Sequence, residues 1–201
     1  IGFALGGGSA KGLAHIGVLK VMEEEKVPIE YITGTSMGSI IGGLYAAGYT
    51  IEEIEKIAVE MDWIELFNDK LDRKDKGITR NLIEDRNTVA LPMEGLIPKL
   101  PSGAVGGKTA SAKLNELFYG VLDIEDFRKL PRKFAAVGTD LNSGEGVMID
   151  KGSIATAIRA SLSLPSIYNP VQVDDKLYVD GGVVRNLPVQ DLKVLGADYT
   201  I

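Results

Sequence analysis

The sequence predicts an α/β protein with a mostly parallel central sheet. Strand-like and helix-like segments alternate along the chain, which is typical of helices packed against a sheet. The chain opens with a strand over residues 1–5, a helix whose apolar residues recur from residue 13 to 22, and a strand over 31–34. This β-α-β order favours parallel pairing with a right-handed crossover. The 201 residues, 45% of them hydrophobic, are enough for one domain with its own core.

Capping and helix-breaking residues mark the ends of the helices. Gly48 ends one helix, and Thr50 with Glu53 forms a capping box that opens the next. Ser153 and Pro188 begin two later helices, since serine caps a helix well and proline suits its first turn. The expected helices cover residues 13–27, 39–47, 50–61, 110–120, 153–160 and 188–196.

Buried apolar runs and alternating segments mark the later strands. A turn at residues 142–144 joins two of them, and Asp174-Asp175 joins two more as a hairpin. Residues 161–170 are interrupted by proline, so we expect them to form a loop. The expected strands cover residues 134–139, 146–149, 171–173, 177–179 and 199–201.

Residues 62–107 differ in composition from the rest of the chain. Charged and polar residues fill 69–76, and residues 87–107 mix apolar residues with prolines and glycines. That composition is typical of an irregular hairpin or flap. A plain surface excursion would explain it, and so would a lid or acyl-chain wall beside a functional site.

Composition excludes several classes of function. With a net charge of -6 and scattered basic residues, a nucleic-acid partner is not expected. The absence of cysteine and the single histidine argue against metal sites, so we expect no metal and no other cofactor. No membrane-spanning run or signal peptide is visible. Because Ile1 and Ile201 both lie in strand-like segments, we expect a domain cut from a longer protein.

Ser36 lies in the pentapeptide Gly-Thr-Ser-Met-Gly at residues 34–38. The pentapeptide follows a predicted strand and precedes a helix of small residues, which is the setting of a nucleophile elbow. Glycines two residues before and after the serine avoid collisions across so tight a turn. A glycine-rich helix start without catalytic function would show the same pentapeptide. The strand, turn and helix favour a serine acyl hydrolase.

The backbone around this serine offers candidate oxyanion donors. The N–H of Met37 is one, and the N–H groups of Gly6, Gly7 and Gly8 are others, because that loop follows the first strand at the edge where sites form in parallel sheets. A glycine-rich loop can also cradle phosphate. Its glycine spacing misses the dinucleotide fingerprint, however, and Lys11 is not followed by serine or threonine, which argues against nucleotide binding.

The general base is predicted to be a carboxylate. The hydrolase order Ser, Asp, His requires a histidine after the nucleophile, whereas the single histidine, His15, lies in the first helix and is interpreted as a packed or hydrogen-bonded residue. Asp180 ends a strand and precedes two glycines, so it is the preferred base; Asp140 and Asp150 are the alternatives. Burial can raise the pKa of an aspartate from about 3.9 toward neutrality.

Several segments resemble those of the patatin-like phospholipase family, and they occur in the family's order over nearly the whole chain. They are Gly6-Gly7-Gly8-Ser9-Ala10-Lys11-Gly12, His15-Ile16-Gly17-Val18-Leu19, Gly34-Thr35-Ser36-Met37-Gly38, Arg159-Ala160-Ser161 with Pro165, Asp180-Gly181-Gly182 and Asn186-Leu187-Pro188. The resemblance implies one patatin-like phospholipase domain over residues 1–201 with a three-layer α/β/α fold.

The resemblance also implies a function and a site. It implies a phospholipase A type acyl hydrolase with Ser36 as nucleophile, Asp180 as base and Gly6, Gly7 and Gly8 as oxyanion donors. The substrate would be a phospholipid or another acyl-ester lipid, met transiently at a membrane surface. A catalytically inactive lipid- or partner-binding domain of the same fold is the alternative.

The match is closest to bacterial members of the family, some of which are passengers of larger outer-membrane proteins. A cell-surface or secreted location is therefore favoured over a cytoplasmic one. A homodimer is a possible assembly.

Overall fold

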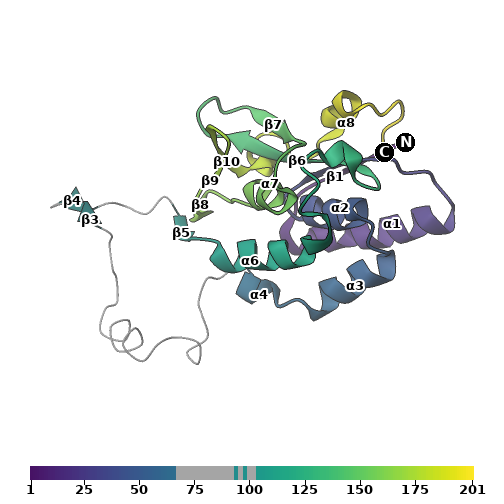
Figure 1. Cartoon of the computed structure of the whole chain (residues 1–201), viewed down its shortest axis with the longest axis horizontal. Coiled ribbons are helices and arrows are strands. Elements are labelled where there is room, and N and C mark those ends of the chain that lie inside the picture. Colours follow the sequence, from purple (N-terminus) through teal and green to yellow (C-terminus); the bar gives the residue numbers. More distant parts are fainter. Residues whose placement is uncertain (67–92, 95–96, 99–102) are drawn as a thin grey trace.

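Six of the described strands form the central sheet of the computed structural model, which describes residues 1–66, 93–94, 97–98 and 103–201 (Figure 1). The order is β1-β2-β6-β10-β9, and β7 pairs with β6 as well. Helices cover both faces, which confirms the predicted three-layer α/β/α fold. The strands are β1 (Gly2–Leu5), β2 (Tyr31–Thr35), β6 (Lys133–Asp140), β7 (Gly146–Ile149), β9 (Val171–Val173) and β10 (Lys176–Asp180).

The sheet is parallel in its first three strands and antiparallel beyond them. The β1-β2 and β2-β6 pairs are parallel, as the β-α-β order predicts, and the second of these pairs ends at Thr35↔Val137. β7 and β10 pair antiparallel with β6, and β9 pairs antiparallel with β10. The parallel strands β1 and β2 therefore end at the same edge, and each is followed there by a glycine-containing turn.

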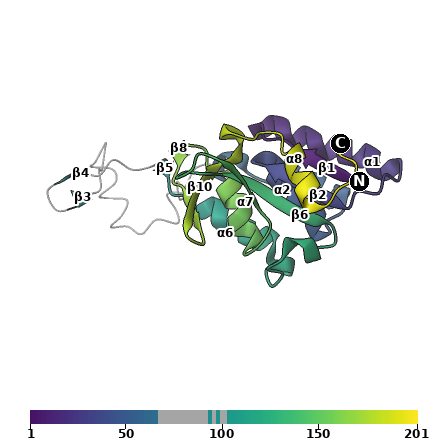
Figure 2. The same cartoon turned by 90° about the horizontal axis from the view of Figure 1, so that it is seen from above.

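The helices are distributed unequally over the two faces. In Figure 1, α8 lies on one side of the sheet, and α1, α2, α3 and α6 lie on the other; Figure 2, seen from above, shows α8 in front of the sheet. The described helices are α1 (Ala14–Glu24), α2 (Met37–Ala47), α3 (Ile51–Glu60), α4 (Trp63–Leu66), α6 (Lys108–Leu117), α7 (Ile154–Ser161) and α8 (Val189–Leu195), with short 3-10 helices at Ser9–Leu13, Tyr119–Val121, Phe127–Lys129 and Gly181–Val183.

Successive side chains of the parallel strands point alternately toward the two helix layers. Ile32 of β2 belongs to the large core shared with α1, α2 and α7, while Thr33 donates a hydrogen bond of 2.9 Å to Pro188 O beside α8. In β1, Ala4 packs with Leu192 of α8 in a small second cluster. This alternation is what a strand buried on both faces requires.

α2 is the most deeply buried helix, and its small residues explain how. It is buried from Met37 to Ala46. A Cβ on Gly42 would lie 2.8 Å from Ile32 Cγ2, and one on Gly43 would lie 2.7 Å from Ile158 Cδ1. A helix that is apolar all round is expected to be buried all round, and here it packs against both β2 and α7.

The predicted flap at residues 62–107 lies mostly outside the described residues. Its described ends are α4 and β5 (Gly103–Val105), and β3 (Met93–Glu94) pairs antiparallel with β4 (Ile97–Pro98) within it. Tyr168 Oη donates a hydrogen bond of 3.2 Å to Leu66 O, so the end of α4 is fixed to the body of the domain.

Two of the predicted elements near the C-terminus need correction. Residues 161–170, predicted as a loop, contain the strand β8 (Ser166–Tyr168), which pairs in parallel with β5. This strand is formed by a partner distant in sequence, so no local pattern predicted it. Of the expected last strand at 199–201, the structure has a bridge between Thr200 and Gly2 rather than a full strand.

None of the described helices combines the length and the apolar character needed to cross a membrane.

We predict that Phe134→Ala lowers the free energy of unfolding by about 3–5 kcal/mol, because the ring lies in the core with no exposed area and its loss leaves a cavity. Val59→Ala is the control: this α3 side chain is 80% exposed, so its loss should change the free energy by no more than about 0.5 kcal/mol. Urea denaturation measures both. Equal losses in the two variants would contradict this account of the core.

Candidate active site

Ser36 occupies a strained turn between β2 and α2. Its φ of 52° and ψ of -124° are unusual for a residue with a side chain. The turn is tight because α2 approaches the strands closely: a Cβ on Gly34 would lie 2.5 Å from Gly38 O, and one on Gly38 would lie 2.3 Å from Leu5 O. The two flanking glycines are therefore required by close approach, and the serine stands at the N-terminus of α2 as the sequence predicts.

Two other serines hold the backbone of Ser36. Its N–H donates to Ser161 Oγ at 2.9 Å, and Ser161 Oγ donates in turn to Val137 O at 2.6 Å. Its carbonyl oxygen accepts from Ser39 Oγ at 2.6 Å and from Ser39 N at 2.8 Å. Hydrogen bonds to hydroxyl groups thus fix the backbone of Ser36 on both sides.

Asp180 lies at the end of β10 with 1% of its surface exposed. Its Oδ1 accepts a hydrogen bond of 2.7 Å from Gly182 N, while the buried Oδ2 has no partner of regular hydrogen-bond geometry among the described residues. Burial raises the pKa of Asp180, and the N–H of Gly182 and the nearby hydroxyl of Ser36 oppose that rise. A carboxylate with a raised pKa and a free oxygen close to a serine is suited to accept a proton.

The two alternative carboxylates lie elsewhere. Asp140 accepts a hydrogen bond from Asn142 N and pairs with Lys176 at 3.3 Å, and these partners hold the pKa of Asp140 below its usual range. Asp150 lies 3.7 Å from the Nε of Arg128. Neither residue lines the cleft at Ser36, so the geometry favours Asp180 among the three.

The glycine loop contacts Ser36, and one of its N–H groups is already hydrogen-bonded. A Cβ on Gly7 would lie 2.9 Å from Ser36 Cβ, and Gly7 and Gly8 line the cleft with Ser36, whereas Gly6 does not. Gly7 N already donates to Asn186 Oδ1 at 3.1 Å, and Asn186 Nδ2 donates back to Gly7 O at 3.3 Å. The N–H groups of Gly8 and Met37 make no hydrogen bond to a described residue, so these two are the donors that are free.

His15 contacts the glycine loop. Its Nε2 donates a hydrogen bond of 2.8 Å to Gly6 O, so the ring anchors the glycine loop to α1. This agrees with the interpretation of His15 as a hydrogen-bonded helix residue. Asn186 and Ser161 are the positions whose contacts sequence reasoning missed: both lie in segments that resemble the family, yet no spacing rule identifies their partners.

Two adjoining cavities make up the site. The cleft that holds Ser36 and Asp180 has a volume of about 320 Å³. An apolar groove of about 550 Å³ shares Ser9 and Leu164 with it. The other residues that line the groove come from the 3-10 helix after the glycine loop, from α2, α4 and from β8: Ala10, Leu13, Met37, Trp63, Ile64, Ile167 and Tyr168.

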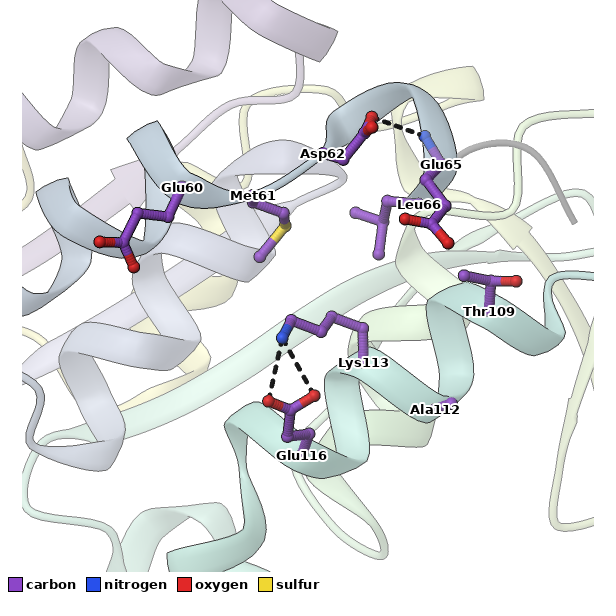
Figure 3. Close-up of a pocket in the computed structure, with 9 residues that line it drawn as sticks. All are labelled: Glu60, Met61, Asp62, Glu65, Leu66, Thr109, Ala112, Lys113 and Glu116. Carbon is purple, nitrogen blue, oxygen red and sulfur yellow. Dashed lines mark hydrogen bonds and ion pairs between the residues drawn. The ribbon is translucent and has the colours of Figure 1, made fainter. Parts of the chain in front are cut away.

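A third cavity, of about 430 Å³, lies between α4 and α6 and is lined mainly by charged residues (Figure 3). Its single cation, Lys113, is bound by Glu116 at 3.0 Å, and Asp62 Oδ1 accepts the N–H groups of Ile64 and Glu65 at the start of α4. This third cavity shares no lining residue with the cleft at Ser36.

Within the described part of the chain, no three histidine or acidic side chains come together as a metal ion would require.

Comparison with known proteins gives consistent results. A family model described as patatin-like phospholipase matches residues 3–193. An uncharacterised NTE family protein of Mycobacterium tuberculosis is 30% identical over 201 residues, which cover 100% of this chain and 48% of that protein. A patatin-like phospholipase domain-containing protein of Caenorhabditis elegans is 32% identical over 203 residues and Lysophospholipase NTE1 of Candida albicans 29% over 201, each covering 100% of this chain and 13% of the relative.

A solved structure shares the fold. VipD from Legionella pneumophila superposes with a TM-score of 0.61 at 16% identity, covering 100% of this chain and 48% of that one. The chain thus spans less than half the length of each of these proteins. The relatives come from bacteria, an animal and a yeast, so the expected likeness to bacterial members stays a prediction.

We predict that Asp180→Asn becomes more stable relative to the wild type as pH rises. A raised pKa means that folded Asp180 holds its proton more tightly than the unfolded chain does. The stability that this gives is present below the unfolded pKa of about 3.9 and is lost as pH rises through the folded pKa. Asparagine keeps the oxygen for Gly182 N–H and carries no charge. Calorimetric melting of both proteins from acid to neutral pH measures the difference, and a difference that shrinks with rising pH would contradict the prediction.

Proposed function

The chain belongs to the patatin-like phospholipase family, and from this premise we propose that it hydrolyses lipid acyl esters, with Ser36 as nucleophile and Asp180 as general base. One observation carries the proposal. The strained serine, the buried carboxylate with a free oxygen and the glycine loop all line one cleft. An inert serine turn would not need a neighbouring carboxylate with a raised pKa.

The first half of the reaction forms an acyl-enzyme. Ser36 Oγ attacks the ester carbonyl carbon while its proton passes to Asp180, and the carbonyl electron pair moves onto oxygen. The N–H groups of Gly8 and Met37 stabilise this oxyanion, and the positive end of α2 supports them. When the intermediate collapses, the alcohol leaves with the proton from Asp180.

The second half releases the fatty acid. Asp180 takes a proton from water, the resulting nucleophile attacks the acyl carbon, and Ser36 leaves with that proton. The N–H of Gly7 can join the other donors only if Asn186 releases it, since Asn186 accepts that hydrogen bond in this structure. The proposed role of Gly6 is restricted to shaping the loop, because its carbonyl is anchored by His15.

The groove indicates the class of substrate. Its lining is almost entirely apolar and it opens beside the nucleophile, as an acyl chain would require. Exposed apolar side chains border the two cavities, among them Ile64, Ile167 and Val183. We propose that they contact a membrane surface transiently while a phospholipid or other acyl lipid enters. The name of the Candida albicans relative is compatible with a lysophospholipid.

Other expectations stay predictions. They are the single domain over 1–201, the homodimer, and the cell-surface or secreted location. A catalytically inactive lipid- or partner-binding domain is the outcome that the next experiment would support if the first proposal fails.

We predict that Ser36→Ala and Asp180→Asn abolish ester hydrolysis in folded protein, because they remove the nucleophile and the general base. General-base catalysis typically contributes a factor of about 10² to 10⁴ to the rate. His15→Gln should retain most activity, since an amide can still donate to Gly6 O. A fluorophosphonate probe should label the wild type at Ser36, as identified by peptide mass spectrometry. A wild type that is folded but not labelled would favour the inactive binding domain. Loss of activity in a folded His15→Gln variant would contradict the two-residue mechanism.

We predict that Ile167→Asp raises KM for long-chain esters and leaves short-chain hydrolysis nearly unchanged, because an acyl chain bound in the groove would cover the new charge and remove it from water. Val194→Asp is the matched control: this exposed valine lies on α8, outside the groove. A p-nitrophenyl ester series of increasing chain length measures the effect. If Ile167→Asp lowered hydrolysis equally at every chain length, the acyl assignment of the groove would be wrong.

A further inference from the structure

Ser161 joins the nucleophile's backbone to the neighbouring strand. It is the last residue of α7 and has no exposed area. Its hydroxyl accepts a hydrogen bond from Ser36 N at 2.9 Å and donates one to Val137 O at 2.6 Å. We propose that Ser161 is a positioning residue for the acyl-transfer reaction: it holds Ser36 in the orientation from which its hydroxyl reaches both Asp180 and the ester. The inference rests on the proposed function of Ser36.

The position of this hydroxyl follows from the sheet. β2 and β6 pair in parallel as far as Thr35↔Val137, and at the next residue the chain turns out of the sheet. Beyond this point, the N–H of Ser36 and the carbonyl of Val137 both bond to the hydroxyl of Ser161. A serine hydroxyl can both accept and donate, so one side chain satisfies both buried groups.

The contact constrains the geometry of the nucleophile. The N–H of Ser36 is fixed by Ser161, and its carbonyl is fixed by Ser39. With both ends of the residue held, its positive φ is maintained and the direction of its Cβ is set. Without the first bond, the turn is free to relax toward a commoner conformation, and the hydroxyl would move away from its partners.

The same end of α7 also holds the base. Asp180 N donates a hydrogen bond of 2.8 Å to Ser163 O, two residues beyond Ser161. The side chain of Ser161 therefore fixes the nucleophile, and the backbone just beyond it fixes the base. One short segment sets the distance between the two reacting groups, although they lie 144 residues apart (180 - 36) in the chain.

The test separates positioning from stability. Ser161→Ala removes the hydroxyl, and Ser161→Cys keeps its size with a weaker donor and acceptor. Thr33→Val is the matched control, because it removes a buried hydroxyl bond from β2, to Pro188 O, without touching Ser36. Each variant is titrated with a fluorophosphonate to count active sites, assayed with a short p-nitrophenyl ester, and examined by hydrogen exchange at the Ser36 amide.

The expected result is a loss of kcat per titrated site of about 10²-fold in Ser161→Ala with KM little changed, as for a nucleophile displaced by about 1 Å. Ser161→Cys should be intermediate, Thr33→Val should match the wild type, and the Ser36 amide should exchange faster in Ser161→Ala. If Ser161→Ala does not fold, Ser161→Cys tests the proposal by its kcat per titrated site and by hydrogen exchange at the Ser36 amide.

Unchanged kcat per titrated site, or an equal loss in Thr33→Val, would overturn the proposal. Unchanged exchange at the Ser36 amide would overturn it as well, and that readout does not depend on activity. If the wild type fails to react with the probe, the proposed function fails, while the exchange measurement still reports whether Ser161 holds the turn.

Discussion

The close approach of α2 to the ends of β1 and β2 is the constraint on which the site depends. At Gly34 and Gly38 there is no room for a side chain, and the serine between them is forced to a φ of 52°. That turn places the serine in the cleft and just before the N-terminus of a helix that is buried from Met37 to Ala46. The small residues of α2 allow this close packing, and the packing in turn sets the geometry of the candidate site. The stability of the fold and the geometry of the site thus depend on the same contacts.

The electrostatic half of the site follows from burial. Asp180 ends the antiparallel strand β10, where almost all of its surface is covered and a single N–H, that of Gly182, supports it. The better supported Asp140 shows the contrast, because the hydrogen bond from Asn142 and the pairing with Lys176 keep its pKa low. The pKa values of these two aspartates, each at a strand end, are therefore shifted in opposite directions. Burial outweighs the hydrogen-bond partners at Asp180, whereas the partners outweigh burial at Asp140.

The sequence predicted those parts of the molecule that local signals encode. The β-α-β opening, the elbow at Ser36 and the placement of Asp180 at a strand end all follow from periodicity and turn residues. It did not predict β8, whose pairing with β5 joins segments that periodicity treats separately. Nor did it predict the contact of Asn186 with Gly7, 179 residues away, or that of Ser161 with Ser36, 125 residues away. Such contacts depend on how the layers pack, which no short window of sequence contains.

The strain at Ser36 also bears on how such a domain would drift in evolution. Glycine at this position would relieve a backbone conformation that costs on the order of 1–3 kcal/mol, and a neutral residue in place of Asp180 would remove a poorly solvated charge. Both changes, which would end the proposed hydrolysis, are therefore expected to stabilise the fold. If the proposed reaction were no longer selected, mutation alone would convert the domain into a more stable scaffold, so retention of both residues in a homologue would indicate purifying selection on that reaction.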